Sequence, residues 1–247
     1  LSLAIFLFLC ASLDIFAMSS SDNNKIINDF KAKYLVNLQS ITKNIEPQLA
    51  NKDLTKKLLI EMAEIDQLVR TDVSQKIYQN CETMDVACQK NIDDANALMV
   101  EIDKANLSIL KLMLQKYTWF KISEFGEDGA QAAWLIVQHA SDIGSPENLD
   151  LQIRVLFLME HLLKTGEANS QHYALLHDRV SLSYAAFGLK QRYGSQFRIS
   201  DNKKQLILEP YEGSIAEVEA RRKSIGLEPL LKNAKQIASD YGIRKII

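Results

Sequence analysis

Apolar residues recur every three or four positions along most of this chain, which is the repeat of one buried face of an α-helix. Proline, the residue that most strongly breaks helices, occurs only 4 times in 247 residues. The repeat predicts helices over residues 24–44, 54–69, 92–117, 130–140, 147–165 and 170–187. A chain of this length can bury a sizeable core. We therefore expect a mainly α-helical, bundle-like domain.

The period of the pattern changes after Gly194. The segments QFRIS and KQLILE, separated by DNKK, predict two short strands joined by a turn, which places a β-hairpin at about residues 195–209. A charged helix follows from Ser214 to Gly226, and Glu228-Pro229 begins the last helix. The expected fold is thus a helical domain with one small β-hairpin in its C-terminal third.

The chain begins with an apolar run of about a dozen residues followed by small and polar ones, which is the length of a signal-peptide core. We predict a signal peptide over residues 1–17, a helical arm over 18–50 and a helical domain over 54–241. The protein would then be secreted or periplasmic, without a stable membrane span after cleavage. A retained membrane anchor and a buried helix are the alternatives.

Two cysteines, Cys81 and Cys88, lie in a polar segment between two helical patterns. On one continuous helix they would be about 10 Å apart, which is beyond bonding distance. An exported protein can form disulfides, so we predict a Cys81–Cys88 disulfide together with a break in the helix. Two free cysteines are the alternative.

The charge balance argues against nucleic acid as a partner. Lys and Arg number 29 against 31 Asp and Glu, which gives a net charge of -2 without a basic cluster. No glycine-rich phosphate loop supports a nucleotide, and neither HExxH nor CxxC is present. The spacing of His161, His172 and His177 favours structural or surface roles. We therefore predict neither a cofactor nor a metal.

Hydrogen-bonding side chains interrupt the apolar helical segments. Gln138 and His139 end the run AQAAWLIVQHA, and Asp178 and Arg179 follow an apolar stretch in LLHDRV. Such groups need partners, because a buried polar group without a hydrogen bond costs about 1–3 kcal/mol. We expect His139, Asp178, Arg179 and Gln191 to form one network.

The helical spacing of Asp66 and Arg70 allows their side chains to meet. A solvated ion pair is the simplest interpretation of this pair. Gln67 beside them raises the alternative that the face is turned toward the core.

Several segments, taken in order, resemble a bacterial family catalogued as domain of unknown function 6624. They are EMAEIDQLVR, GEDGAQAAWLIVQHA, ALLHDRV, QRYGSQ and EARRKSIGLEPL, and the resemblance covers about residues 54–241. The family name implies no activity. The resemblance assigns motif positions to Asp66, Gln67, Arg70, Trp134, Gln138, His139, Gln152, Asp178, Arg179, Gln191, Tyr193, Gly194 and Gln196. Ser195 stands where the family pattern has Thr, and the insertion around Cys81 is longer than usual.

Two functions remain open at this stage, and whether the chain is an enzyme is undecided. The first is a binding or interaction module with a polar cleft for a small polar or anionic ligand, or for a protein partner. Its ligand-binding residues would be Gln138, Arg179, Gln191, Tyr193 and Gln196. The second is an acid-base hydrolase-type enzyme that uses His139 and Asp178, since a carboxylate can tune a histidine for work near neutral pH.

The apolar start and the two cysteines together generate a prediction about the exported protein. We expect it to begin near residue 18 and to contain one disulfide. Intact-mass measurement with and without a reductant tests both statements. Two free thiols would contradict the disulfide, and an uncleaved apolar segment would contradict the signal peptide.

Overall fold

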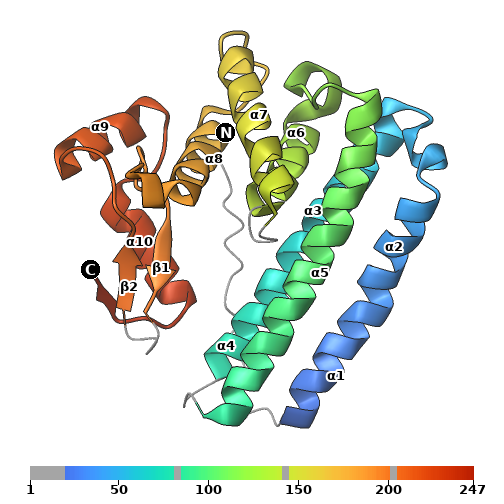
Figure 1. Cartoon of the computed structure of the whole chain (residues 1–247), viewed down its shortest axis with the longest axis horizontal. Helices are drawn as coiled ribbons and strands as arrows, with labels where there is room; N and C mark the ends of the chain where they lie inside the picture. The colour runs from blue at the N-terminus through green and yellow to red at the C-terminus, as the bar shows by residue number, and fades with distance from the viewer. Residues whose placement is uncertain (1–19, 81–84, 141–144, 201–204) are drawn as a thin grey trace.

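A computed structural model describes residues 20–80, 85–140, 145–200 and 205–247 (Figure 1). The expected signal peptide at 1–17 and Cys81 lie outside the described residues. Cys88 is buried in the first turn of α5, and its pairing with Cys81 stays a prediction. Within the described part of the chain, no helix is long and apolar enough to cross a membrane.

The N-terminal half is a bundle of three long helical rods (Figure 1). The first contains α1 (Ser20–Phe30), the π-helical η1 (Lys31–Leu35) and α2 (Val36–Lys43), followed by the short η2 (Glu46–Leu49). The second contains α3 (Lys52–Leu68), the π-helical η3 (Val69–Gln75) and α4 (Lys76–Asn80). The third is α5 (Val86–Lys116). The apolar repeat explains this layer, since each rod buries one face in a common core.

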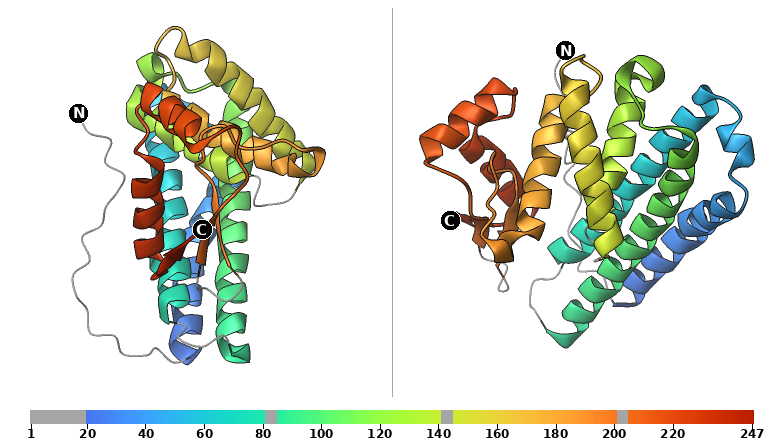
Figure 2. Two further views of the ribbon diagram at one scale, coloured as in Figure 1. Left: turned by 90° about the vertical axis from the view of Figure 1, so that its left-hand side faces the viewer. Right: turned by 45° about the horizontal axis from the view of Figure 1, so that its top comes forward.

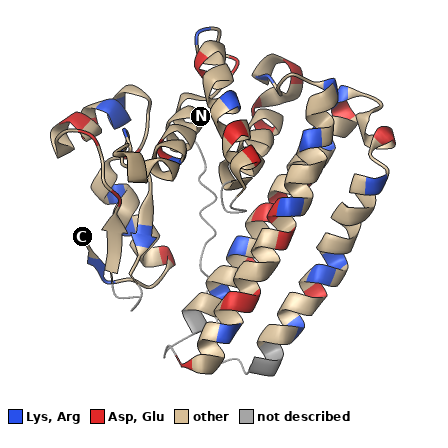
Figure 3. Cartoon of the chain, viewed as in Figure 1, with Lys and Arg blue, Asp and Glu red and all other residues tan. Residues whose placement is uncertain are grey.

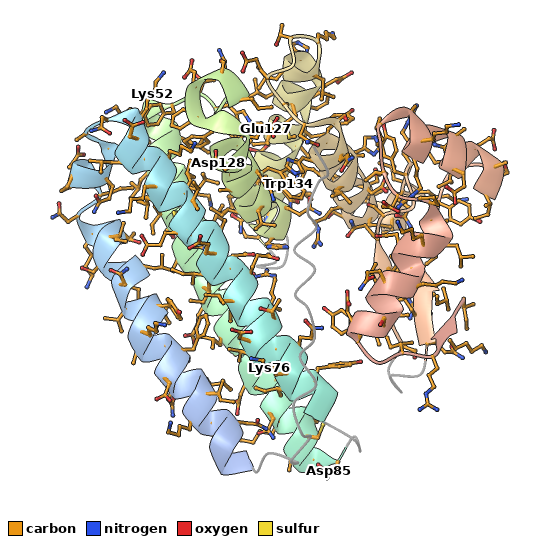
Figure 4. All side chains as sticks on the ribbon, turned by 180° about the vertical axis from the view of Figure 1, so that it is seen from behind. Lys52, Lys76, Asp85, Glu127, Asp128 and Trp134 are labelled. Atoms are coloured by element: carbon orange, nitrogen blue, oxygen red, sulfur yellow. The ribbon has the colours of Figure 1, made fainter. Side chains whose placement is uncertain are left out.

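Helix caps set where the second and third rods begin. The Asn51 side chain accepts a hydrogen bond from the amide of Leu54, and the Asp85 side chain accepts one from the amide of Cys88. Such caps satisfy amides that have no partner within the helix. Lys52 and Asp85 therefore mark opposite ends of the bundle (Figure 4).

A second group of helices packs across one end of this bundle. It consists of α6 (Ile122–His139), α7 (Pro146–Leu163), α8 (Ser170–Ser183) and the short η5 (Ala185–Phe187). α6 packs on α3, and α7 packs on α8. Gly126 has a φ of 74° and kinks the start of α6, which a residue without a Cβ does at little cost. Trp134 lies on the straight part of α6 beyond this kink (Figure 4).

The C-terminal unit contains a small three-stranded sheet. Its strands are β1 (Phe197–Ile199), β2 (Gln205–Leu208) and β3 (Lys245–Ile246), in the order β1-β2-β3. β1 and β2 are antiparallel, with Arg198 opposite Ile207, and β3 adds in parallel to β2. Two helices, α9 (Ile215–Ser224) and α10 (Leu230–Asp240), complete the unit. A separate apolar cluster forms its core from Leu206, Ala234, Ala238 and Ile243.

The C-terminal unit reaches back to the bundle through its last helix. The Gln75 amide donates to the backbone oxygen of Asp240 at 2.7 Å, and the Tyr78 and Tyr241 rings meet edge to face with centroids 5.8 Å apart. Figure 2 shows α10 in front of the α3–α4 rod when the molecule is turned by 90°. This contact closes one side of the site described next.

The predicted fold class is confirmed, because the chain is mainly helical with a hairpin near its C-terminal third. Acidic and basic side chains are mixed along the rods (Figure 3). The predicted helix over 24–44 covers η1 without its π-helical form, and the pattern did not predict η3, α4 or β3. Each is short, and β3 has only two residues, too few to show a period of two.

Candidate functional site

Two carboxylates and one guanidinium form a buried ion-pair cluster between α3 and α5. The side chains of Asp66 and Asp103 are only 1% and 2% exposed. Arg70 Nη1 donates to Asp66 Oδ1 at 3.0 Å, and Arg70 Nη2 donates to both Asp103 oxygens at 3.0 Å. The Asp66–Arg70 face is therefore turned into the protein, and the solvated ion pair is the wrong interpretation of this spacing.

His139 joins the same cluster from the end of α6. Its Nδ1 lies 2.9 Å from Asp66 Oδ1, while the Gln67 amide donates to Asp66 Oδ2 at 2.7 Å. Burial opposes ionisation of Asp66, but the charges and hydrogen bonds of His139 and Arg70 outweigh it, so the pKa of Asp66 is lowered. Asp66 is therefore an anion at neutral pH and can only accept hydrogen bonds.

The protonation of His139 follows from this geometry. Burial lowers the pKa of His139 below its usual value; Asp66 opposes the shift, whereas Arg70 and Arg179 add to it. The imidazole is thus neutral at pH 7, with its proton on Nδ1 facing Asp66. Nε2 keeps its lone pair and makes no hydrogen bond with the described residues. The side chain is 13% exposed, which leaves part of the ring open to solvent.

A pocket of about 210 Å³ lies against Arg70. η3, α4 and α5 form its sides, and Tyr241 from the C-terminal unit closes it. Arg70 is the one charged side chain among the described residues that line it; the others are Ser74, Gln75, Tyr78, Ile92, Ala95, Asn96, Met99 and Tyr241. Burial and the neighbouring Tyr241 raise the pKa of Tyr78 to about 12. The phenol therefore stays protonated and can donate a hydrogen bond.

Asp178 serves a different network. Its carboxylate accepts hydrogen bonds from the backbone amides of Arg192, Tyr193 and Ser195 at 2.6–3.0 Å. Gly194 in this turn has a φ of 64°, and a Cβ there would lie 3.2 Å from both Leu230 and Val218. Asp178 therefore holds the segment between α8 and β1 onto the helical body.

Gln191 and Arg222 hold the same turn from other sides. The Gln191 side chain is fully buried. It accepts a hydrogen bond from the backbone amide of Gln196 at 2.8 Å and donates one to the Glu209 carbonyl at 2.6 Å. Arg222 of α9 donates to the backbone oxygens of Tyr193 and Gly194 at 2.8 and 3.2 Å. The turn is thus fixed by three buried polar side chains from three parts of the chain.

The expected single network of His139, Asp178, Arg179 and Gln191 is therefore wrong. Among the described residues no hydrogen bond joins His139 to Asp178 or Gln191; the partner of His139 is Asp66. Arg179 lies near enough to His139 to lower its pKa. The prediction failed because, among the described residues, His139 bonds to Asp66 of the bundle whereas Asp178 bonds to the turn at residues 192–195.

The other predicted binding residues make contacts within the protein. Gln138 is buried and its amide lies 3.5 Å from the Leu175 carbonyl. Tyr193 is buried, and the side-chain amide of Gln196 donates a hydrogen bond to Ser195 Oγ at 3.0 Å. Gln152 donates to the Val137 and Gln138 carbonyls and so caps the end of α6. A ligand-binding role for Gln138, Tyr193 and Gln196 stays a prediction.

The remaining histidines lie apart from the buried cluster. His172 stacks on Trp134 with ring centroids 4.1 Å apart, and burial lowers its pKa to about 4. His177 meets the edge of the Tyr193 ring, and His161 is exposed on α7.

Sequence reasoning missed Asp103. It lies on the buried face of α5 beside Ile102 and three residues before the buried Asn106. An acidic residue at a core position of a long helix was the available signal, since a buried carboxylate needs a partner.

The chain belongs to the family of unknown function DUF6624, whose model matches residues 52–246. The resemblance expected over about 54–241 is thus confirmed. No curated protein and no solved structure matches the chain. The matched region contains Asp66, Arg70, Asp103 and His139, and it excludes the first helical rod.

The geometry of the Asp178 network generates a stability prediction. Asp178→Asn replaces one acceptor oxygen by a donor that faces backbone amides, so the free energy of unfolding should fall by about 1–3 kcal/mol. Urea denaturation measures this change. The matched control is Asp128→Asn, because Asp128 forms an exposed pair with Lys56 and such pairs contribute only about 0–1 kcal/mol. Equal losses in both variants would contradict the assigned role.

Proposed function

We propose that this domain is a binding module for a small polar molecule, and that its site is the pocket beside Arg70. The observation that carries the proposal is the position of Arg70 between two buried carboxylates, at the wall of a pocket whose other described lining residues are uncharged. Holding ions away from water costs several kcal/mol. A fixed polar group at the wall of a pocket is the arrangement that orients a ligand.

The lining restricts the size and chemistry of the ligand. A volume of about 210 Å³ holds roughly seven groups of water size, at about 30 Å³ each. Ile92, Ala95 and Met99 offer apolar contacts, while Tyr78 and Tyr241 offer ring faces and hydroxyl groups. A small planar molecule fits this combination, with its hydrogen-bonding or anionic end directed toward Arg70.

Two related probes test this proposal. Benzoate and its neutral analogue benzamide should both bind weakly, with a dissociation constant of about 1 mM, equivalent to about −4 kcal/mol. Ligand-observed NMR measures both affinities. Ser74→Phe fills the pocket and should abolish binding, whereas Ser108→Phe places the same ring on the exposed face of α5 and should leave it unchanged. Absence of binding by either probe, or binding that survives Ser74→Phe, would refute the proposal.

The Asp66–His139 contact favours a second candidate function, acid-base catalysis. A carboxylate that accepts a hydrogen bond from Nδ1 fixes the tautomer and leaves the lone pair of Nε2 directed away from the carboxylate, which is the arrangement of a general base. The partner of His139 in this proposal is Asp66 in place of Asp178, because the Asp178 carboxylate holds backbone amides.

Hydrolysis of p-nitrophenyl acetate in the presence of EDTA tests the second candidate. His139→Ala should reduce the rate by about 10²-fold or more, the contribution of a positioned general base. His161→Ala removes an exposed histidine of α7 and should leave the rate unchanged. Melting temperatures of both variants separate a catalytic loss from unfolding. A rate equal to that of buffer, or a folded His139→Ala variant with full activity, would eliminate this candidate.

We further propose that the chain is exported and that Cys81 and Cys88 form a disulfide. The apolar start of the sequence and the spacing of the two cysteines support this proposal. The intact-mass measurement described above tests it. Export would place the pocket in contact with molecules outside the cytoplasm.

A further inference from the structure

We propose that Asp66, Asp103 and His139 form a binding site for one divalent transition-metal ion, which enters in exchange for the guanidinium of Arg70. One potential ligand atom from each of the three side chains lies within 4.8 Å of the others. Two carboxylates and an imidazole suit zinc, which takes three protein ligands and one open position in catalytic sites. This inference goes beyond the small-molecule pocket and does not depend on it.

The three ligands lie on rigid elements. Asp66 belongs to α3, Asp103 to α5 and His139 to α6, and each of these helices packs on the other two. Zinc bonds of 2.0–2.2 Å place tetrahedral ligand atoms about 3.4 Å apart. The ligand atoms lie within 4.8 Å of one another, so the widest separation has to close by up to roughly 1 Å to reach this value. His139 Nδ1 and Asp66 Oδ1 are already 2.9 Å apart and have to separate slightly. Rotation of the side chains can supply both small adjustments.

The charge of the cluster favours a divalent ion. Asp66 and Asp103 contribute two negative charges, and the Arg70 guanidinium pairs with both of them. A divalent ion between the carboxylates would neutralise both of them. The Arg70 side chain already places a cation between the two buried carboxylates.

Arg70 has room to leave this position. Its side chain is 18% exposed, against 1% and 2% for the two aspartates. It also lines the 210 Å³ pocket, and none of the other described lining residues is charged. A guanidinium that rotates into this pocket keeps contact with solvent and with hydrogen-bonding groups such as Gln75 and Asn96. Metal binding would therefore move Arg70 into this pocket.

The surroundings supply what a metal ligand set requires. The Gln67 amide holds Asp66 Oδ2 at 2.7 Å and leaves Oδ1 directed at His139 and Arg70, as outer-shell partners do in metal sites. The metal would replace the proton between His139 Nδ1 and Asp66 Oδ1, and that proton would move to Nε2. The imidazole stays neutral, so its ligation releases no proton.

Zinc alone is the probe for the first experiment. The metal-free protein, with its cysteines alkylated after reduction, is titrated with Zn²⁺ by calorimetry, and retained metal is measured after gel filtration. We expect one equivalent per chain. Asp103→Asn and His139→Gln should each weaken binding by about 100-fold, since each removes one of three ligands. Asp128→Asn, at an exposed aspartate of α6, is the matched control and should bind like the parent chain.

Arg70→Met is the decisive variant. It removes the competing cation and should tighten zinc binding by about tenfold or more, because a positive charge 3.0 Å from each carboxylate no longer has to be displaced. Cobalt(II) absorption typical of tetrahedral coordination gives an independent readout in the parent chain if a variant fails to fold. Absence of stoichiometric zinc, binding that survives Asp103→Asn and His139→Gln, or weaker binding by folded Arg70→Met would each overturn the proposal. Benzoate binding by the metal-free protein is measured separately, so failure of one proposal is distinguishable from failure of the other.

Discussion

The interaction on which the helical body depends is the bridge that Arg70 makes between Asp66 and Asp103. The two carboxylates are almost without solvent, and the guanidinium places one positive charge within 3.0 Å of both of them. Removing one member of such a buried pair typically costs about 3–5 kcal/mol. A hydrophobic trio could fill the same space at no such cost. The bridge therefore sets which faces of α3 and α5 meet, and it brings a charge to the pocket wall.

A second polar cluster fixes the position of the turn that begins the C-terminal unit. Asp178, Gln191 and Arg222 place their hydrogen bonds on backbone atoms of one turn, and together they fix where β1 begins. Most of these bonds are to amides and carbonyls that would otherwise lose their partners in a buried position. The motif-like residues thus divide into those that order a turn and those that meet at Arg70. The sequence offered no means of separating the two sets, because both consist of polar residues in apolar surroundings.

How well each element could be predicted depends on how far apart in the sequence its interacting residues lie. Helical spacing is local, so α3 and α8 could be located from the sequence to within four residues at each end. α5 begins at Val86, six residues before the predicted start at residue 92. The hairpin was also predictable, because β1 and β2 are neighbours joined by a short connection. β3 pairs with β2 across about 40 residues and has no local pattern of its own. The Asp66–His139 contact spans 73 residues, and the helix faces that bring these residues together are set by packing.

The sequence revealed only some members of the buried ion-pair cluster. Asp66, Arg70 and His139 could each be recognised as polar residues that needed partners, but their partner Asp103 belongs to a long helix whose apolar repeat masks it. The His139–Asp178 pairing was a reasonable choice among the residues already in view. It failed because Asp178 has nearer donors in the backbone of residues 192–195. Closing a short loop costs less conformational entropy than closing a long one. Hydrogen bonds to nearby backbone amides therefore form in preference to a bond with a distant side chain.

The contact between the C-terminal unit and the bundle links the two clusters physically. The turn fixed by Asp178 begins the unit that contains α10, and the end of α10 brings Tyr241 to Tyr78 and to the pocket beside Arg70. The edge-to-face contact of the two rings contributes about 0.5–1.5 kcal/mol beyond the area that it buries. The side-chain amide of Gln75 also donates a hydrogen bond to the Asp240 carbonyl. The pocket wall at Tyr241 thus belongs to the C-terminal unit, whereas the wall at Arg70 belongs to the helical body. A molecule entering from that side would displace contacts of the C-terminal helix while the ion-pair cluster stays in place.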